Sequence, residues 1–338
     1  MKKILAILMA VAMLLSMAAC GSTPAPATTA GAEADQTEGA TAAAQEKFVI
    51  GICQLVPHEA LDAATKGFMD RITEELGEEN VEFLVEMGGG DTATCAPIVT
   101  DFVSKEVDLI LANATPALQA AAAATEDIPI LGTSVTEYGV ALDLKDFSGV
   151  VGGNISGTSD LAPLDQQAAM VKEWFPDAKN VGLLYCSAEA NSKYQVETVK
   201  AELEALGYTC KVYAFTDSND VQSVTQTAAA ASDVLYIPTD NTAASAMPTI
   251  DGVCYDEEIP VITGEEGTCK GAGIATLSIS YYELGVATGD MAVKILRDGA
   301  DISTMEIGYA PVTKKYNAER CTELGLTPPS DEYVAIEK

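Results

Sequence analysis

The stretch Asp233-Val-Leu-Tyr-Ile-Pro-Thr-Asp-Asn-Thr242 indicates how this chain folds. Its apolar residues 234–237 suit a buried strand, and a carboxylate, an amide and two hydroxyl groups follow directly. Open parallel α/β sheets hold ligands at such strand ends, where a strand stops and a helix begins. We therefore predict a parallel sheet with ligand-contacting groups along its C-terminal edge.

The same alternation of strand and helix patterns extends over the chain from residue 48 onward. Short apolar runs predict strands, and apolar side chains at helical spacing predict the helices between them. The expected strands are 48–55, 81–87, 109–113, 128–135 and 150–153 in a first series, and 180–186, 209–215, 234–239 and 261–264 in a second. This rhythm predicts an α/β fold with two doubly wound parallel-sheet lobes.

The last part of the chain predicts a multi-crossover hinge between the lobes. A long helix at 281–296, an edge strand at 305–311 and a short helix at 318–324 are each too small to form a domain. Each must pack on a lobe that has already formed. We expect lobe 1 to comprise residues 48–155 and 280–304, and lobe 2 to comprise 156–279 and 305–338.

The N-terminal segment is typical of an exported lipoprotein. Lys2 and Lys3 precede an uncharged run from Ile4 to Ala19, which is short for a membrane span but suits an export signal. Small residues before Cys20 resemble a lipoprotein processing site, so we expect residues 1–20 to be a signal peptide. Lipidation of Cys20 would anchor the protein to the cell membrane on its outer side; cleavage elsewhere is the alternative. Residues 21–47 lack Leu, Ile, Val and aromatic residues and predict a flexible linker.

Composition argues against several classes of function. The formal net charge of −31 without a basic cluster repels nucleic-acid phosphates, so no nucleic-acid partner is expected. Eight cysteines without a Cys-x-x-Cys pair, and a single histidine, lack zinc-site spacing, so no metal site is expected. The chain shows no nucleophile elbow, phosphate loop or dinucleotide fingerprint, so we expect no catalytic residue and no cofactor.

Polar residues follow four of the predicted strands. Helix N-termini with hydroxyl groups beside them can hold a carboxylate, and a buried, unpaired Asp240 would attract an ammonium group. For any single strand end, a helix cap is the alternative interpretation. For His58, which could line the site, the alternative interpretation is a structural role. The candidates at these four strand ends are Thr115, Thr136, Tyr138, Asn191, Ser192, Asp240, Asn241 and Thr242.

Six segments together resemble a family of substrate-binding lipoproteins of ABC importers whose known members bind tryptophan, phenylalanine or tyrosine. These segments are Ala60-Leu-Asp-Ala-Ala-Thr-Lys-Gly-Phe68, Ala114-Thr-Pro-Ala117, Gly157-Thr-Ser-Asp160, Glu189-Ala-Asn-Ser192, Pro238-Thr-Asp-Asn-Thr242 and Tyr281-Tyr-Glu-Leu-Gly285. The resemblance covers about residues 48 to 325. It implies a type I periplasmic-binding fold, with a hinge of three crossovers and a ligand trapped as the lobes close.

The resemblance also implies roles for individual residues. Thr115, Thr136, Asn191 and Ser192 would contact the ligand's carboxylate, and Asp160 and Asp240 are candidates for its ammonium group. Gln54 and His58 would line the cleft, with Ser159 beside Asp160. The chain departs from the family at Glu137-Tyr138, where Asp-Pro is common, at Ser280, where Asp is common, and in 265–270. Tyr138 would either stack on an aromatic ring or cover the lobe surface.

The resulting hypothesis is an extracytoplasmic, lipid-anchored receptor that captures a small amino acid-like ligand, aromatic by resemblance, and delivers it to ABC permease and ATPase subunits. It performs no chemistry on the ligand. Three alternatives remain open at this stage: a sensor that presents its closed form to a chemoreceptor or kinase, a binding protein for another small solute, and an extracytoplasmic enzyme.

Overall fold

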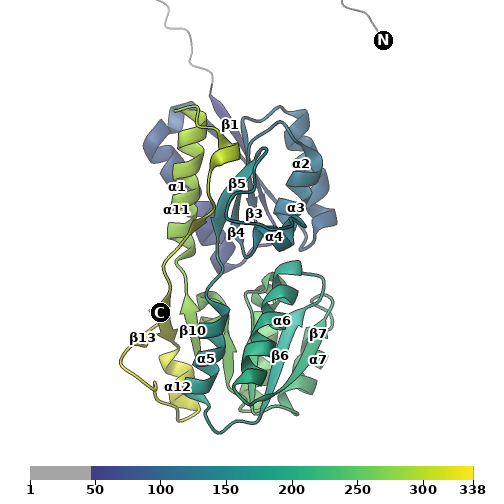
Figure 1. Cartoon of the computed structure of the whole chain (residues 1–338), viewed down its shortest axis with the longest axis vertical. Helices are drawn as coiled ribbons and strands as arrows, with labels where there is room; N and C mark the ends of the chain where they lie inside the picture. The colour runs from purple at the N-terminus through teal and green to yellow at the C-terminus, as the bar shows by residue number, and fades with distance from the viewer. Residues whose placement is uncertain (1–46, 338) are drawn as a thin grey trace, which may run out of the picture. The chain divides into compact units, whose positions relative to one another are not determined.

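The computed structural model describes residues 47–337 (Figure 1). The expected signal peptide, Cys20 and the expected linker up to residue 46 lie outside the described residues. Within the described part of the chain, no helix has both the length and the apolar character needed to cross a membrane.

The first sheet has six strands in the order β11-β5-β4-β3-β1-β2, and all of its neighbouring pairs are parallel. Because parallel strands need helical crossovers, helices cover both of its faces. One face packs against α1 and α11, and the other against α2 and α3 (Figure 1). The strands are β1 Phe48–Gln54, β2 Val81–Met87, β3 Leu109–Asn113, β4 Ile130–Val135, β5 Ile155–Ser159 and β11 Gly308–Tyr309. The helices are α1 Glu59–Leu76, α2 Thr92–Ser104, α3 Thr115–Ala124, α4 Tyr138–Ala141 and α11 Tyr281–Leu296, with short 3₁₀ turns at Glu78–Asn80 and Ile302–Thr304.

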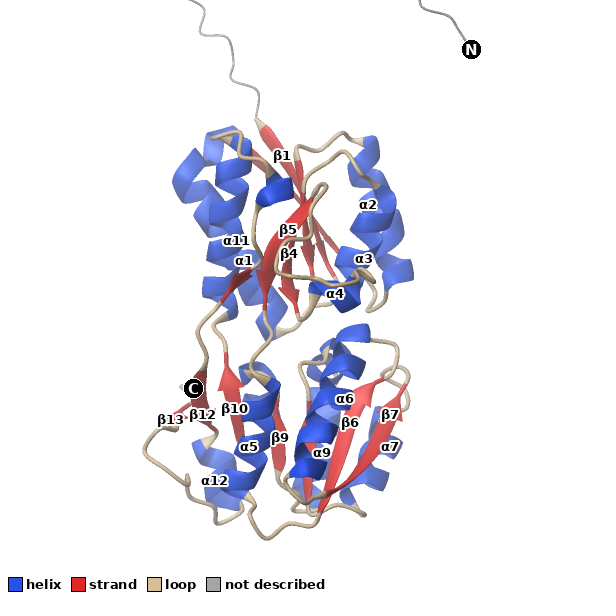
Figure 2. Ribbon diagram, in the orientation of Figure 1, coloured by secondary structure: helices blue, strands red, loops and turns tan. Residues whose placement is uncertain are grey.

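The second sheet has seven strands in the order β13-β12-β10-β9-β8-β6-β7 (Figure 2). All neighbouring pairs are parallel except β10 with β12. The strands are β6 Asn180–Cys186, β7 Thr209–Phe215, β8 Val234–Ile237, β9 Val261–Thr263, β10 Ala275–Ser278, β12 Thr313–Tyr316 and β13 Val334–Ala335. The helices are α5 Leu164–Trp174, α6 Ala190–Ala205, α7 Val221–Ala229, α8 Asn241–Ser245, α9 Met247–Asp256, α10 Glu266–Gly271 and α12 Ala318–Glu323. The predicted fold class, two doubly wound lobes, is thereby confirmed.

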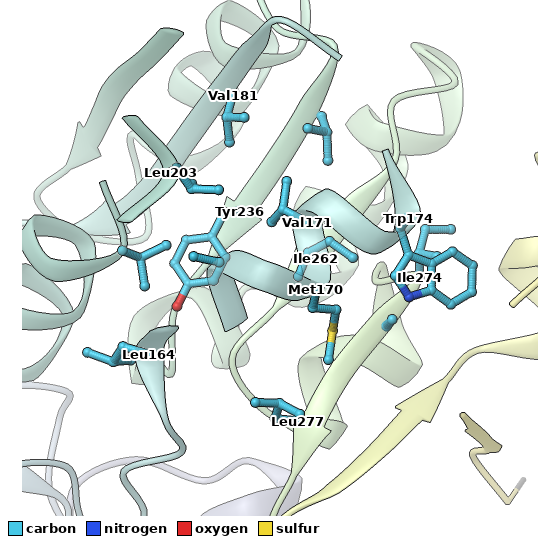
Figure 3. Close-up of a cluster of buried hydrophobic side chains, with 14 of the residues drawn as sticks. Leu164, Met170, Val171, Trp174, Val181, Leu203, Tyr236, Ile262, Ile274 and Leu277 are labelled. Carbon is cyan, nitrogen blue, oxygen red and sulfur yellow. The ribbon is translucent and has the colours of Figure 1, made fainter. Parts of the chain in front are cut away.

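One core cluster of the second lobe shows how an alternating strand divides its side chains between two faces. Tyr236 of β8 lies in a cluster with Leu203 of α6 and Val171 of α5 (Figure 3). Its neighbours in the strand, Leu235 and Ile237, belong to the cluster on the opposite face. All of β8 is buried, as expected for a strand covered on both sides.

Strand pairing corrects two of the expected lobe boundaries. β5 pairs with β4, so the expected boundary after residue 155 falls inside a strand of the first sheet. β11 pairs with β5, so residues 308–309 also belong to the first sheet rather than to lobe 2. The chain therefore passes between the sheets three times, after β5, after β10 and after β11.

The expected strand at 150–153 is wrong. Gly152 and Gly153 have φ values of 84° and 60°, and Val150 makes only an isolated bridge to Glu306. The actual strand is β5, whose sequence Ile-Ser-Gly-Thr-Ser is polar but fully buried. Hydrophobic runs could not identify it, because its burial comes from its position between β4 and β11 in the first sheet.

Close packing between α1 and α11 depends on glycine. A Cβ atom at Gly285 would lie 2.0 Å from the carbonyl oxygen of Ala64, and one at Gly67 would lie 2.1 Å from that of Tyr282. The two helices approach at a distance that no larger side chain permits at these positions. This contact ties α11 to the first lobe, although the chain reaches α11 from the second lobe.

Candidate functional site

A small chamber lies where strand ends of the two sheets meet; we call it the inner chamber. Six predicted ligand residues line it: His58, Thr136, Asp160, Asn191, Asp240 and Asn241. Six further lining residues were not predicted as contacts: Leu61, Ser134, Thr239, Ala244, Glu265 and Tyr281. Both lobes and the start of α11 therefore contribute, as expected where parallel strands end at a switch point of the sheet.

Asp160 is the carboxylate with a free oxygen in this chamber. Its side chain is 3% exposed, and the Tyr281 hydroxyl donates to its Oδ2 at 2.8 Å. Its Oδ1 is buried and has no hydrogen-bond partner among the described residues. Burial raises the pKa of the Asp160 carboxyl to about 6, although the hydrogen bond from Tyr281 opposes this shift. A buried carboxylate in this state favours a cationic partner.

Two further buried polar atoms in the inner chamber lack partners. Ser134 Oγ and Asn191 Oδ1 each have no hydrogen-bond partner within residues 47–337. Ser134 also has a φ of 54°, a left-handed conformation that is unusual for a serine at the end of a strand. Because buried polar atoms are normally paired, the gathering of three unpaired ones here marks a site for a polar ligand group.

Asp240 has a different role from the one predicted. Its Oδ2 accepts the N–H of Cys186 at 2.6 Å, and its Oδ1 accepts the N–H of Ala243 at 2.8 Å. The expectation that this carboxylate is unpaired is therefore wrong: it caps α8 and ties that helix to β6. Burial, and then the neighbouring charge of Glu189, raise the pKa of the Asp240 carboxyl to about 8.

Glu189, which sequence reasoning missed as a site residue, occupies the position predicted for a ligand carboxylate. Its Oε1 accepts the N–H and the hydroxyl of Thr242, each at 2.8 Å. Its Oε2 accepts two hydrogen bonds from Asn241, one from the backbone N–H at 3.1 Å and one from the side-chain Nδ2 at 2.7 Å. The donors at the start of α8 thus bind a carboxylate of the protein itself. The sequence did offer a signal, because Glu189 lies three residues after the end of β6. It belongs to the segment Glu189-Ala-Asn-Ser192, of which only Asn191 and Ser192 were predicted as site residues.

Glu265 plays the same part at α10. Its side chain accepts the N–H groups of Gly267 and Thr268, although it also lines the inner chamber. Both helix starts on this side of the chamber are therefore capped by acidic side chains. No lysine or arginine belongs to the described lining of the chamber, whose acidic side chains are Asp160, Asp240 and Glu265.

The remaining predicted residues lie outside the lining of the inner chamber. Gln54, the last residue of β1, donates a hydrogen bond to Asp62 and accepts one from the Thr65 hydroxyl. Thr115 is buried at the start of α3, and Ser192 is buried beside Asp240. The Ser159 hydroxyl donates to the carbonyl oxygen of Thr136 at 2.8 Å.

The structure corrects one of the two roles predicted for Tyr138. Its side chain is fully buried, its hydroxyl donates to the carbonyl oxygen of Thr158 at 3.0 Å, and its ring stacks on Phe147. It is a core residue of the first lobe and not a surface cover; it lines a neighbouring cavity rather than the inner chamber, and its stacking on a ligand ring stays a prediction.

Two contacts join the lobes near the chamber. His58 Nε2 lies 3.3 Å from Asn241 Oδ1, and Lys270 Nζ lies 2.6 Å from Glu59 Oε1. Each links the start of α1 to the second lobe. Within the described residues, no group of histidine, cysteine, aspartate and glutamate side chains is arranged to hold a metal ion.

Comparison with known proteins places this architecture in a family. A family described as ABC transporter substrate binding protein matches residues 49–319. A tyrosine-binding protein of Clostridioides difficile (strain R20291) is 36% identical over 269 residues, which are 78% of this chain and 75% of that protein.

Two solved structures agree with this assignment. The ABC domain in complex with L-Trp from Streptococcus pneumonia superposes with a TM-score of 0.81 at 32% identity, covering 86% of this chain and 100% of that one. The ligand-free, open structure of a substrate-binding protein with adhesive properties from Clostridium difficile gives a TM-score of 0.65 at 37% identity, with the same two coverages. With two parallel-sheet lobes, three crossovers and a chamber between them, this chain belongs to the family of ABC transporter substrate-binding proteins and has the type I periplasmic-binding fold.

Proposed function

We propose that this protein captures an amino acid with an aromatic side chain outside the cytoplasmic membrane and delivers it to an ABC permease and its ATPase. Lipidation of Cys20 would hold it at the membrane. The relatives that carry a ligand in their description, a tyrosine-binding protein and a structure in complex with L-Trp, support the aromatic class.

One observation carries the amino acid assignment. Asp160 Oδ1, Asn191 Oδ1 and Ser134 Oγ are three unpaired, buried oxygen atoms that line one chamber. An α-ammonium group has three N–H donors and a positive charge, so it matches three acceptors, one of which is a carboxylate. The first lobe supplies Ser134 and Asp160, and the second supplies Asn191.

Contact with both lobes explains how binding would favour closure. A ligand shifts a conformational equilibrium only through its different affinity for the two states. With the lobes apart, the ammonium group would lose Asn191 on one side or Asp160 on the other. The closed form alone offers all three acceptors, and a permease can recognise that form.

The test is titration calorimetry with the twenty amino acids, followed by thermal denaturation at saturating ligand. We expect tryptophan, tyrosine or phenylalanine to bind most tightly and to be recovered unchanged. At about 100 times the dissociation constant, ligand linkage adds about 2.7 kcal/mol of stability, enough to raise the melting temperature by several degrees. Binding of sugars or aliphatic amino acids alone would refute the aromatic assignment.

Two analogues of tryptophan test the ammonium site directly. Indole-3-propionate lacks the ammonium group, and tryptamine lacks the carboxylate. We expect indole-3-propionate to lose most of the affinity, because three buried oxygen atoms would stay unpaired. Equal affinity of indole-3-propionate and tryptophan would contradict the assigned role of Asp160.

A further inference from the structure

The inner chamber is too small for an aromatic ring. Its cavity volume of about 10 Å³ has room for the centre of about one water-sized group. It suits the ammonium end of an amino acid, so a ring must extend into a neighbouring space. Three of its lining residues, His58, Ala244 and Glu265, also line a second cavity of about 420 Å³, which we call the outer chamber.

The outer chamber has apolar residues from both lobes beside four charged ones, Glu59, Asp251, Glu265 and Lys270. Ala60 of α1 faces Ala244, Met247 and Pro248 of the second lobe. Methionine is adaptable in shape, and its sulfur makes favourable contacts with aromatic rings. The ion pair between Glu59 and Lys270 joins the lobes at residues that also line this cavity.

Gly271 determines where the Met247 side chain lies. A Cβ atom at Gly271 would come within 2.2 Å of Met247 Cγ. A larger residue there would push Met247 from its position. The wall of the outer chamber therefore depends on close contact between α9 and α10.

A third cavity, of about 520 Å³, is the other candidate for the ring; we call it the hinge chamber. The hinge chamber shares only Thr136 with the inner chamber. At this shared residue, the hydroxyl of Ser159, which lines the hinge chamber, donates to the carbonyl oxygen of Thr136. Its lining includes Glu137 and Glu306. The outer chamber shares three lining residues with the inner chamber, whereas the hinge chamber shares one, so the outer chamber is the more direct continuation of the inner one.

We propose that the outer chamber holds the side chain of the ligand and that Met247 and Ala60 set the largest ring that fits. This inference rests on the proposed capture of an aromatic amino acid. It adds the direction in which the ring points and the residues that select it.

Calorimetry with tryptophan as the probe tests the inference in the full mature protein. Met247→Trp adds bulk where the ring of the ligand would contact Met247, and we expect the steric conflict to raise the dissociation constant by roughly 10- to 100-fold. Met247→Leu conserves volume and is expected to change it by less than about fivefold. Ser148→Trp adds the same bulk at an exposed residue of the hinge chamber and is expected to leave the constant unchanged.

A spectroscopic measurement on the unaltered chain avoids dependence on a folded variant. With ¹³C-labelled methionine methyl groups, tryptophan binding should shift the Met247 signal upfield through the ring current, and Met247→Leu identifies that signal. Met170, in the core of the second lobe, is the internal control. Suppose that the wild type binds tryptophan, but the Met247 signal does not shift and Met247→Trp does not raise the dissociation constant. The ring then lies elsewhere, and only this inference fails. If the wild type binds no aromatic amino acid, the proposed function fails as well.

Discussion

Replacing Asp160 with asparagine separates the ligand-binding role of this side chain from its cost to the fold. The variant keeps the size of the side chain and an oxygen that can accept the Tyr281 hydroxyl, but it removes the negative charge. That charge is buried, and its unpaired oxygen makes ionisation unfavourable in the absence of ligand.

The magnitude follows from the shift in pKa. The Asp160 carboxyl has a pKa of about 6 in the folded protein against 3.8 as its ordinary value. A shift of about two units corresponds to about 3 kcal/mol. Because the folded pKa is raised, the stabilising contribution is fully present below about pH 4 and is lost as the pH rises through about 6. At pH 8 the wild-type protein without ligand carries the full cost.

We therefore expect Asp160→Asn without ligand to melt several degrees above the wild type at pH 8 and to lose this advantage below about pH 4. It should also lose the ligand-induced stabilisation. Wild-type affinity should fall by up to tenfold per pH unit below about pH 6, as the carboxylate that binds the ammonium becomes protonated.

Thermal denaturation followed by circular dichroism between about pH 3 and 8, with calorimetry at the same values, makes these measurements. Asp127→Asn removes one exposed carboxylate of the first lobe and controls for the change in net charge. If ligand-free Asp160→Asn is less stable than the wild type at pH 8, the carboxylate stabilises the fold and the reasoning from burial is refuted. If it keeps full affinity, Asp160 does not bind the ammonium.

Two further substitutions test the structural roles of site and hinge residues. Asp240→Ala leaves the N–H groups of Cys186 and Ala243 unpaired, and it should lower the unfolding free energy by roughly 1–2 kcal/mol even without ligand; unchanged stability in urea denaturation would show that this carboxylate is not a cap. Gly285→Ala places a Cβ against the Ala64 carbonyl oxygen and should cost about 1–3 kcal/mol; a melting temperature equal to that of the wild type would show that α1 and α11 can separate without loss.

Most of the regular elements were predictable because their signals are local. Central strands such as 109–113 and 234–237 are buried on both faces and therefore read as continuous apolar runs. Helices such as 281–296 carry apolar residues at helical spacing. The polar strand β5 was missed because neither signal applies to Ile-Ser-Gly-Thr-Ser.

The candidate site was predictable in part. Residues after strands converge whenever the strands are parallel, so His58, Thr136 and Asn241 reach the inner chamber as expected. Which carboxylate is free was not predictable from their order. Asp160 and Asp240 each follow a strand, yet two backbone N–H groups reach Asp240, whereas Asp160 keeps one oxygen without a partner among the described residues.

The sequence by itself determined the alternation of strands and helices, the two-lobed α/β class and the strand ends that could carry a ligand. These features depend on side-chain patterns within a few residues of one another, which sequence order preserves. Only the tertiary structure decided which sheet β5 and β11 join, that Glu189 caps the N-terminus of α8, and that Asp160 Oδ1 has no hydrogen-bond partner among the described residues. Each of these depends on residues that lie far apart in the sequence and meet only in the folded chain.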